Sequence, residues 1–386
     1  MQKKLIALAI AAISAAPAFA QSNVTIYGRA DYGYLSRSGD DGAVVNTDRK
    51  NEFASGLGAG SRIGFKGSED LGNGLKTIFQ MEFGLGLDGS ASTAAAGGNS
   101  ATWWNRNSYI GVTGNFGTVV GGKLDGVRYG IFNKYDAFGG GNVGNFTQMT
   151  AQVDRAENAI AYISPKFGGG FDLTLAYAMH IGTNNPLLLA TQEGGNAVGA
   201  ATCATNATVC NGNDGDAGLN TIRLAYGNGP ISVDLDWERV SFKSKGAAGS
   251  TASLVDDITV MTIGGSYNFG MVKVSALWDN LKTDGRNGTG TLADVDSWML
   301  SASVPYGNFV FKGTYGETED DQVNNSEGKK FGLGLQYNLS KRTNIYANYG
   351  KISNDRAATY RISPAANSQG TGYGVTGFDV GMAHSF

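Results

Sequence analysis

Side chains that could act as an acid, a base or a nucleophile in catalysis are few. His180 and His384 are the only histidines, and no Gly-x-Ser-x-Gly segment marks an activated serine. His384 falls on the apolar side of an alternating segment, and His180 ends another. A nucleophile needs a base within hydrogen-bond reach, and no spacing among the 33 acidic residues marks a carboxylate pair. The sequence therefore indicates no catalytic residue, no metal site and no cofactor.

The two cysteines indicate a structural role. Cys203 and Cys210 are separated by six residues in a stretch rich in Gly, Asn, Ala and Thr. Two cysteines cannot build a zinc site without histidines. In an oxidising compartment we expect them to form a disulfide that closes a small loop, a constraint worth roughly 2–3 kcal/mol.

Several charged residues stand inside segments in which apolar and polar residues alternate. Arg62 alternates with Ile63 and Phe65, while Arg29 and Glu82 fall on the polar side of similar segments. A charge that faces lipid near the bilayer midplane costs about 2–4 kcal/mol. If these segments cross a membrane, the charged side chains must therefore face a water-filled interior.

The elements that would position these charges follow a period of two. In residues 231–238, Ile, Val, Leu and Trp alternate with Ser, Asp, Asp and Glu, and residues 173–179, 272–279 and 331–339 behave similarly. Such alternation is typical of β-strands with one apolar face. Strands of about ten residues are long enough to cross a bilayer at a tilt.

Short and long connections alternate between these segments. The short ones are residues 70–74, 113–117, 166–171, 227–229, 269–270, 306–307 and 340–342. The long ones lie near residues 36–60, 85–103, 124–156, 181–218, 241–256, 282–294, 317–329 and 353–372. Seven short turns and eight long loops predict sixteen strands. An even strand number with loops sorted by length is the plan of an outer-membrane barrel, and a soluble β-sandwich is the weaker interpretation.

The first residues have the three parts of a secretory signal. Lys3 and Lys4 are followed by the apolar stretch 5–12 and by the small-x-small site Ala18-Phe19-Ala20. We expect residues 1–20 to be a cleaved signal peptide and residues 21–386 to form the mature barrel. No later stretch approaches the ~18–20 consecutive apolar residues of a membrane-spanning helix.

Composition excludes several classes of protein. The chain has 386 residues with 59 glycines but only 6 prolines and no three-residue period, which excludes collagen. Its 18 Phe and 17 Tyr residues are too many for a disordered chain. The formal charge of −3 lacks the basic excess that nucleic-acid binding requires. The 41% of hydrophobic residues is low for a large domain with a conventional core.

Several motifs together resemble one family. Residues 24–29 (VTIYGR), 61–67 (SRIGFKG), 69–76 (EDLGNGLK) and 339–346 (LSKRTNIY) are similar to strands and turns of the trimeric general porins of Gram-negative bacteria, of the β-proteobacterial type. The terminal Phe386, preceded by alternating apolar positions, resembles the C-terminal signature of outer-membrane barrels. The resemblance extends from the signal peptide to Phe386.

The resemblance implies an all-β fold, a transmembrane 16-stranded antiparallel barrel with an in-folded third loop at about residues 124–156. It also implies a ladder of basic residues on the inner wall of the pore constriction. The matching positions are Arg29, Arg62, Arg106, Arg155 and Lys123.

The candidate constriction loop has apolar anchors in Phe132, Tyr135 and Phe138 and a bend at residues 139–141 (GGG). Its acids and bases are mixed. The acidic residues are Asp125, Asp136 and Asp154, and the basic residues are Arg128 and Lys134. With Glu82 partly offsetting the wall arginines, we predict a weak to moderate anion preference. We expect most acids in loops and the arginines on the wall.

The predicted protein is an outer-membrane porin that admits ions and small hydrophilic solutes by passive diffusion. Its implied partners are two identical subunits in a homotrimer, membrane lipid and lipopolysaccharide, with no nucleic acid. Three alternatives remain, namely a barrel hydrolase, a sugar-specific channel and an adhesin. A sugar channel would need an aromatic track along the lumen, whereas most aromatic residues fall on the outward side. An adhesin would not conduct.

Overall fold

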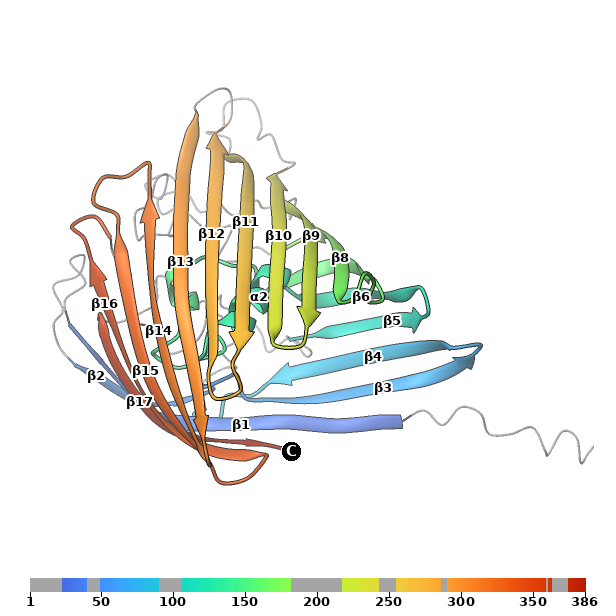
Figure 1. Ribbon diagram of the computed structural model, residues 1–386, viewed down its shortest axis with the longest axis horizontal. Coiled ribbons are helices and arrows are strands. Elements are labelled where there is room, and N and C mark those ends of the chain that lie inside the picture. The colour runs from blue at the N-terminus through green and yellow to red at the C-terminus, as the bar shows by residue number, and fades with distance from the viewer. Residues whose placement is uncertain are drawn as a thin grey trace, which may run out of the picture.

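The computed structural model describes residues 23–39, 49–89, 106–181, 217–242, 255–285, 290–358, 360–362 and 374–386. Antiparallel strands form nearly all of the regular structure (Figure 1). The first half of the chain contributes β1 (Asn23–Ser38), β2 (Lys50–Ser55), β3 (Arg62–Gly72), β4 (Leu75–Gly84), β5 (Ser108–Gly114), β6 (Gly117–Asp125), β7 (Arg155–Ile163) and β8 (Phe171–His180). The second half contributes β9 (Ala217–Asn228), β10 (Ile231–Phe242), β11 (Val255–Asn268), β12 (Lys273–Gly285), β13 (Thr291–Tyr306), β14 (Phe309–Asp320), β15 (Gly328–Asn338), β16 (Thr343–Asn354) and β17 (Thr376–Ser385).

The sheet closes on itself because the first strand pairs with the last. In the register of β1 with β17, Arg29 lies opposite Ser385 and Ser38 lies opposite Thr376. Gly28 and Phe386 also exchange two backbone hydrogen bonds of 3.1 Å each. Closure removes the unpaired strand edges, which cannot face lipid. The result is a closed antiparallel barrel.

The seventeen strand segments fill sixteen positions around the barrel. β3 pairs with the first half of β1, from Asn23 to Arg29. β2 pairs with the second half, from Tyr32 to Arg37. The two segments therefore form one interrupted strand position. The prediction that residues 36–60 form a loop was wrong, because β1 continues to Ser38 and residues 50–55 return beside it.

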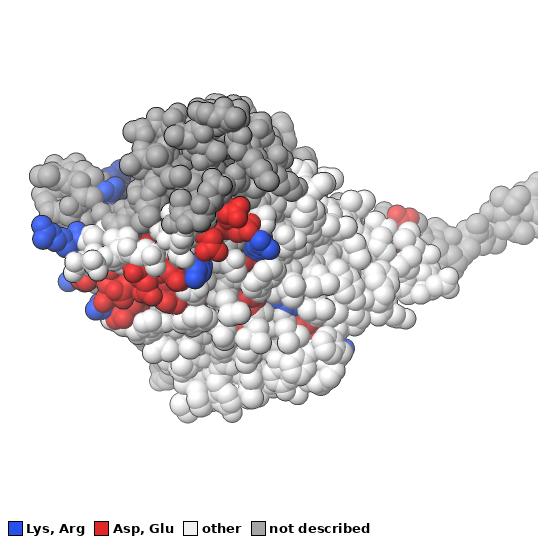
Figure 2. Space-filling model, turned by 90° about the horizontal axis from the view of Figure 1, so that it is seen from above, with Lys and Arg blue, Asp and Glu red and all other residues white. Residues whose placement is uncertain are grey.

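Side chains alternate between two environments along the strands. In β10, Leu235 is 44% exposed, whereas its neighbours Asp234 and Asp236 are 0% and 4% exposed. Apolar residues dominate the exposed, outward face, as a lipid-facing surface requires. Figure 2 shows a broad area nearly without charge beside a region where charged residues gather. The predicted alternation is confirmed.

Aromatic residues gather on the outward side near the short turns. They are Phe116, Phe167, Tyr267, Phe269, Tyr306 and Phe309. Tyr267 and Phe269 lie with ring centroids 4.5 Å apart, and the rings of Phe309 and Tyr337 lie 4.7 Å apart. Aromatic girdles of this kind mark the membrane interface of outer-membrane barrels. Among the described residues, no helix is long and apolar enough to cross a membrane.

The connection between β6 and β7, residues 126–154, contains the helix α2 (Val127–Tyr135) and a short 3-10 helix (Thr147–Met149). We call it the loop segment. α2 contacts β10, β11 and β12. Phe132 and Phe146 are fully buried and belong to a cluster that includes the strand residues Leu277 and Met299. Much of the buried apolar surface therefore lies between the loop segment and the inner face of the strands.

Candidate functional site

Three arginines meet on the inner face of the first strands. Arg29 and Arg62 are direct cross-strand partners of β1 and β3. The position of Arg106, just before β5, is fixed by its N–H, which donates to the carbonyl of Glu82 at 3.2 Å. We call Arg29, Arg62, Arg106 and the Glu82 carboxylate the arginine cluster. Like charges directly opposite each other destabilise a sheet. The pairing of Arg29 with Arg62 is therefore unfavourable for the stability of the fold.

Glu82 is the carboxylate at the centre of this cluster and is 4% exposed. It forms an ion pair with the Arg106 guanidinium, and the Arg62 Nε lies 3.7 Å from its Oε2. The Tyr27 hydroxyl donates to the same Oε2 at 3.1 Å. One acid is thus shared by two arginines, which leaves a local excess of positive charge.

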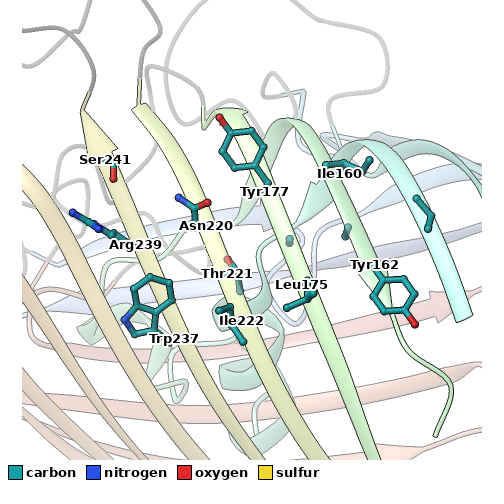
Figure 3. A pocket seen from close by; sticks show the side chains of 13 residues that line it. Ile160, Tyr162, Leu175, Tyr177, Asn220, Thr221, Ile222, Trp237, Arg239 and Ser241 are labelled. Carbon is teal, nitrogen blue, oxygen red and sulfur yellow. The ribbon is translucent and has the colours of Figure 1, made fainter.

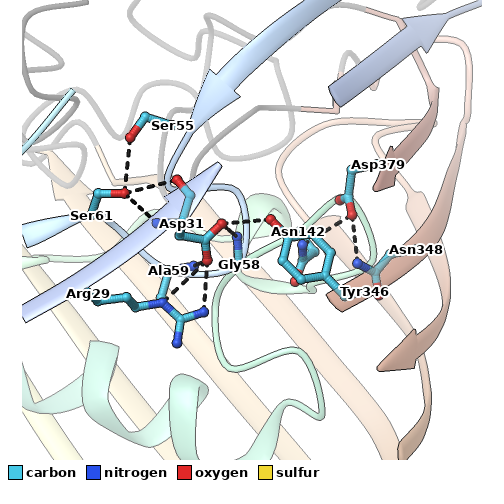
Figure 4. A network of polar contacts seen from close by, with 10 residues as sticks. All are labelled: Arg29, Asp31, Ser55, Gly58, Ala59, Ser61, Asn142, Tyr346, Asn348 and Asp379. Atoms are coloured by element: carbon cyan, nitrogen blue, oxygen red, sulfur yellow. Dashed lines mark hydrogen bonds and ion pairs between the residues drawn. The ribbon is translucent and has the colours of Figure 1, made fainter. Parts of the chain in front are cut away.

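Asp31 is a wall acid that the sequence analysis did not single out. Its carboxylate accepts from Arg29 at 2.8 Å and from the Tyr346 hydroxyl at 2.6 Å, and it also accepts the backbone N–H of Ala59 at 3.1 Å (Figure 4). Asp31 follows Arg29 by two residues and so shares its face, a signal available from the alternation alone. It orients Arg29 and reduces the net charge of the site.

Lys123 and Arg155, also predicted for the constriction, form a second group. Lys123 Nζ lies 2.8 Å from the Glu157 carboxylate. Arg155 Nε lies 3.1 Å from the carboxylate of Asp125, its cross-strand partner. Each base in this group therefore has its own acid. The structure brings Arg29, Arg62, Glu82 and Arg106 together and places Lys123 and Arg155 in separate ion pairs.

Asp154 lies beside this second group, at the end of the loop segment. Burial raises the pKa of its carboxyl to about 7, with Arg155 opposing the rise and Asp125 adding to it. Its Oδ1 is buried without a hydrogen-bond partner. The charge at this point of the molecule therefore changes near neutral pH.

Asp136, the predicted acid of the constriction, serves the loop segment itself. It is 5% exposed and accepts the backbone N–H groups of Phe138 at 2.9 Å and Phe146 at 2.6 Å. The Thr314 hydroxyl of β14 donates to it at 3.0 Å. Burial raises the pKa of its carboxyl, and these hydrogen bonds oppose the rise. Asp136 thus holds the loop together, and no contact that the structure describes joins it to the five predicted bases.

Acids on the inner wall hold the loop segment in place. Asp379 of β17 accepts the side-chain amide of Asn142 at 3.1 Å (Figure 4). It also accepts the backbone N–H of Val143 at 2.7 Å. Lys134 Nζ lies 2.6 Å from Asp234 of β10. Such charge-assisted hydrogen bonds are among the stronger contacts available.

The helix of the loop segment is held in the same way. Arg128, 1% exposed, donates through Nε to Asp279 of β12 at 2.8 Å and also forms an ion pair with that carboxylate. Glu238 of β10 accepts the Arg128 backbone N–H at 3.3 Å. The inner wall nevertheless carries acids as well as the expected arginines. Those that are buried there are Asp31, Asp234, Asp236, Glu238, Asp279 and Asp379.

Glycines let the loop backbone approach the wall. Gly332 and Gly350 are cross-strand partners on β15 and β16. A Cβ on Gly332 would clash with the carbonyl of Gly144, and one on Gly350 would clash with that of Val143. The glycine content of the strands is therefore partly explained by the backbone that lies against them.

The outer surface carries a separate groove of about 700 Å³ on β6 to β10. Ile160, Leu175, Ile222 and Trp237 line it, with Arg239 near its polar end (Figure 3). These apolar side chains belong to the outward face, so the groove is distinct from the arginine cluster inside.

Within the described ranges, no group of three or more His, Cys, Asp or Glu side chains is arranged to hold a metal ion. Cys203 and Cys210, the predicted disulfide, and residues 1–20, the predicted signal peptide, lie outside the described residues. These two expectations stay predictions.

Comparison with known proteins gives a consistent set of relatives. Residues 7–357 match the family model described as Gram-negative porin. Outer membrane porin protein 32 of Delftia acidovorans is 32% identical over 406 residues, covering 100% of both chains. An outer membrane porin protein of Bordetella pertussis is 27% identical over 416 residues and covers 97% of this chain and 99% of its own.

Solved structures are similar as well. The anion-selective porin from Comamonas acidovorans superposes with a TM-score of 0.72 and 26% sequence identity. The match covers 95% of this chain and 100% of that chain. The sequence comparisons and the structure comparisons therefore both identify porins as similar proteins.

Proposed function

The chain belongs to the Gram-negative porin family and is an outer-membrane porin, and we propose that the arginine cluster gives its channel a weak to moderate preference for anions. Porins admit ions and small hydrophilic solutes by passive diffusion, without turnover or cofactor. The fold class and outer-membrane location agree with the resemblance found in the sequence.

One observation carries the proposal. Arg29, Arg62 and Arg106 meet on the inner face, and among the described residues the acids that form ion pairs with them are Asp31 and Glu82. Three positive and two negative charges leave a net positive charge at this point of the wall. A net positive charge on the wall of a pore raises the local anion concentration and lowers that of cations. A relative of similar fold is named for anion selectivity, which supports the proposal.

We further propose that the loop segment narrows the channel beside the arginine cluster. Leu57 and Gly58, in the interruption between β2 and β3, support this arrangement. The Asn142 backbone N–H donates to the Leu57 carbonyl, and a Cβ on Gly141 would clash with the Gly58 carbonyl. The loop therefore comes close to the strand that carries Arg62. A narrow passage brings permeating ions close to the arginine cluster, where screening by salt is least effective.

The proposed partners follow from the family and from the outward face. Gram-negative porins of this type are typically trimers, and the apolar outward face suits both a subunit interface and lipid. We propose a homotrimer in contact with membrane lipid and with lipopolysaccharide near the long loops.

Reconstitution into a planar bilayer tests the proposed function. In a KCl gradient, an anion-preferring channel makes the dilute side negative at zero current. An adhesin or purely structural barrel gives no conductance steps. A channel with the opposite sign of zero-current potential refutes the anion preference while leaving the porin assignment intact.

A further inference from the structure

A third group of cations lines a cavity of its own. A cavity of about 310 Å³ opens between the end of α2 with the chain that follows it and the strands β12, β13 and β14. Lys273, Ser303 and Lys312 line it from the strands, and Lys134 and Asp136 line it from the loop segment. We call it the lysine cavity. None of the residues of the arginine cluster lines it.

The strand register sets two of the lysines on either side of a serine. Lys273 is the cross-strand partner of Ser303, and Ser303 is in turn the partner of Lys312. Adjacent strands lie about 4.8 Å apart, so the backbones that carry the two lysines are about 10 Å apart. The next row on the same face is Ser275, Ser301 and Thr314. The wall of the cavity thus presents two ammonium groups and several hydroxyls.

The charges in the lysine cavity are not balanced. Lys134 has an acid partner, since its Nζ lies 2.6 Å from Asp234. Lys273 Nζ instead donates to the backbone carbonyl of Lys134 at 2.9 Å. Lys312 Nζ lies 6.0 Å from the centre of the Phe138 ring. Neither Lys273 nor Lys312 forms an ion pair with an acid in the part of the chain that the structure describes.

Asp136, the acid that lines the cavity, is already engaged. Its oxygens accept hydrogen bonds from Phe138, Phe146 and Thr314. Lys273 and Lys312 therefore line one cavity without an ion pair to a carboxylate, and an anion bound between them would supply a charge partner for both. The donors available are N⁺–H and O–H groups, which suit an acceptor with several oxygens.

We propose that the lysine cavity binds a small multivalent oxyanion of the inorganic phosphate class. Lys273 and Lys312 supply the charge, and the Ser303 hydroxyl between them supplies a further donor. Lys273 is the first residue of β12 and Ser303 lies three residues before the end of β13, so the site lies toward the short-turn end of the barrel. It rests on the proposed function, because the anion reaches it through the channel.

The test is the effect of inorganic phosphate on chloride current through single reconstituted channels. Phosphate added to both sides should reduce the current in a saturable manner in the wild-type protein. Lys273→Gln and Lys312→Gln should each raise the half-blocking concentration by roughly tenfold, because each removes one charge-assisted contact. Ser303→Ala should raise it by a smaller factor and leaves every charge in place.

Lys282→Gln is the matched control. Lys282 lies on β12 as Lys273 does, but on the outward-facing parity, with its Nζ 3.8 Å from Asp294. Its substitution removes the same charge and should leave the phosphate block unchanged. A difference in gel migration between unboiled and boiled samples verifies that each variant has folded.

Two results overturn the proposal. The first is a wild-type channel that phosphate does not block saturably. The second is a block that survives in the double variant Lys273→Gln/Lys312→Gln, or, where that variant does not fold, a block unaffected by Ser303→Ala. A channel with anion preference in KCl but no phosphate block refutes only the lysine cavity. A channel with phosphate block but no preference for chloride refutes only the proposed function.

Discussion

At the scale of single residues, the position of Arg29 opposite Arg62 is the feature that folding does not explain. Two like charges directly opposite each other on adjacent strands destabilise the sheet. Asp31 and Glu82 offset part of that cost through ion pairs at 2.8 Å with Arg29 and 3.7 Å with Arg62. The two arginines thus lie side by side although they repel each other. This arrangement is consistent with a role in attracting anions.

Glu82→Gln tests how the charges in the cluster balance. The substitution keeps the shape of the side chain but removes the carboxylate that Arg62 and Arg106 share. We expect the ratio of anion to cation permeability to rise roughly two- to fivefold, because one charge at close range changes ion energies by about RT. The zero-current potential in a KCl gradient measures this ratio. An unchanged or lower anion preference would show that Glu82 does not act on permeating ions.

Asp154 predicts a pH dependence of selectivity. With a pKa of about 7, its carboxyl is neutral at lower pH and becomes negative as pH rises through that value. We expect anion preference to be greater well below pH 7 than well above it, since ionisation adds a negative charge beside Arg155. Zero-current potentials recorded across this range measure the effect. Asp154→Asn should abolish this step, and a variant that keeps it would assign the titration to another group.

At the scale of elements, the loop segment is attached to strands that are remote in sequence. Its contacts join Lys134 to Asp234, Arg128 to Asp279 and Val143 to Asp379. The partners come from β10, β12 and β17, so the segment is held at several points around the barrel. The position of the loop therefore depends on the wall acids.

Asp379→Ala tests this attachment. It removes the acceptor for the Val143 N–H and for the amides of Asn142 and Asn348, and each donor left unsatisfied costs about 1–3 kcal/mol. We expect noisier open-channel current, because part of the loop loses its anchor while the strands stay paired. Asp257→Ala, which removes an acid paired with Arg239, is the control and should leave current noise unchanged.

The sequence predicted the strands better than it predicted the site. Strict alternation in β10 and β12 predicts that Asp234 and Asp279 face the inside of the barrel. A register shifted by one residue would instead turn both carboxylates toward lipid. Nothing local could reveal that Lys134 and Arg128 are their partners, because these pairs are separated by 100 and 151 residues. Lys50–Ser55 was missed as a strand because its alternation is short and it follows a long loop.

At the scale of the whole molecule, the modest hydrophobic content has a structural explanation. Outward residues such as Ile26 and Leu300, 60% and 52% exposed, face the membrane. A smaller buried cluster joins the loop segment to the wall. The chain therefore covers a large outer surface with apolar side chains instead of filling one central core.

The proposed homotrimer is tested by electrophoresis. An unboiled sample should migrate as a species much larger than the monomer and convert to the monomer on boiling, because barrels closed by hydrogen bonds resist detergent until heated. Chemical cross-linking before boiling should preserve a species of three subunits. A monomer-sized band alone under both conditions would contradict the trimer.

The central claim is that the arginine cluster makes this porin prefer anions. The most direct test compares the zero-current potential of the wild-type channel with that of Arg62→Gln across the same KCl gradient. We expect a wild-type potential that is negative on the dilute side and a variant potential closer to zero. A wild-type potential that is positive on the dilute side, or a variant with the wild-type value, would contradict the account.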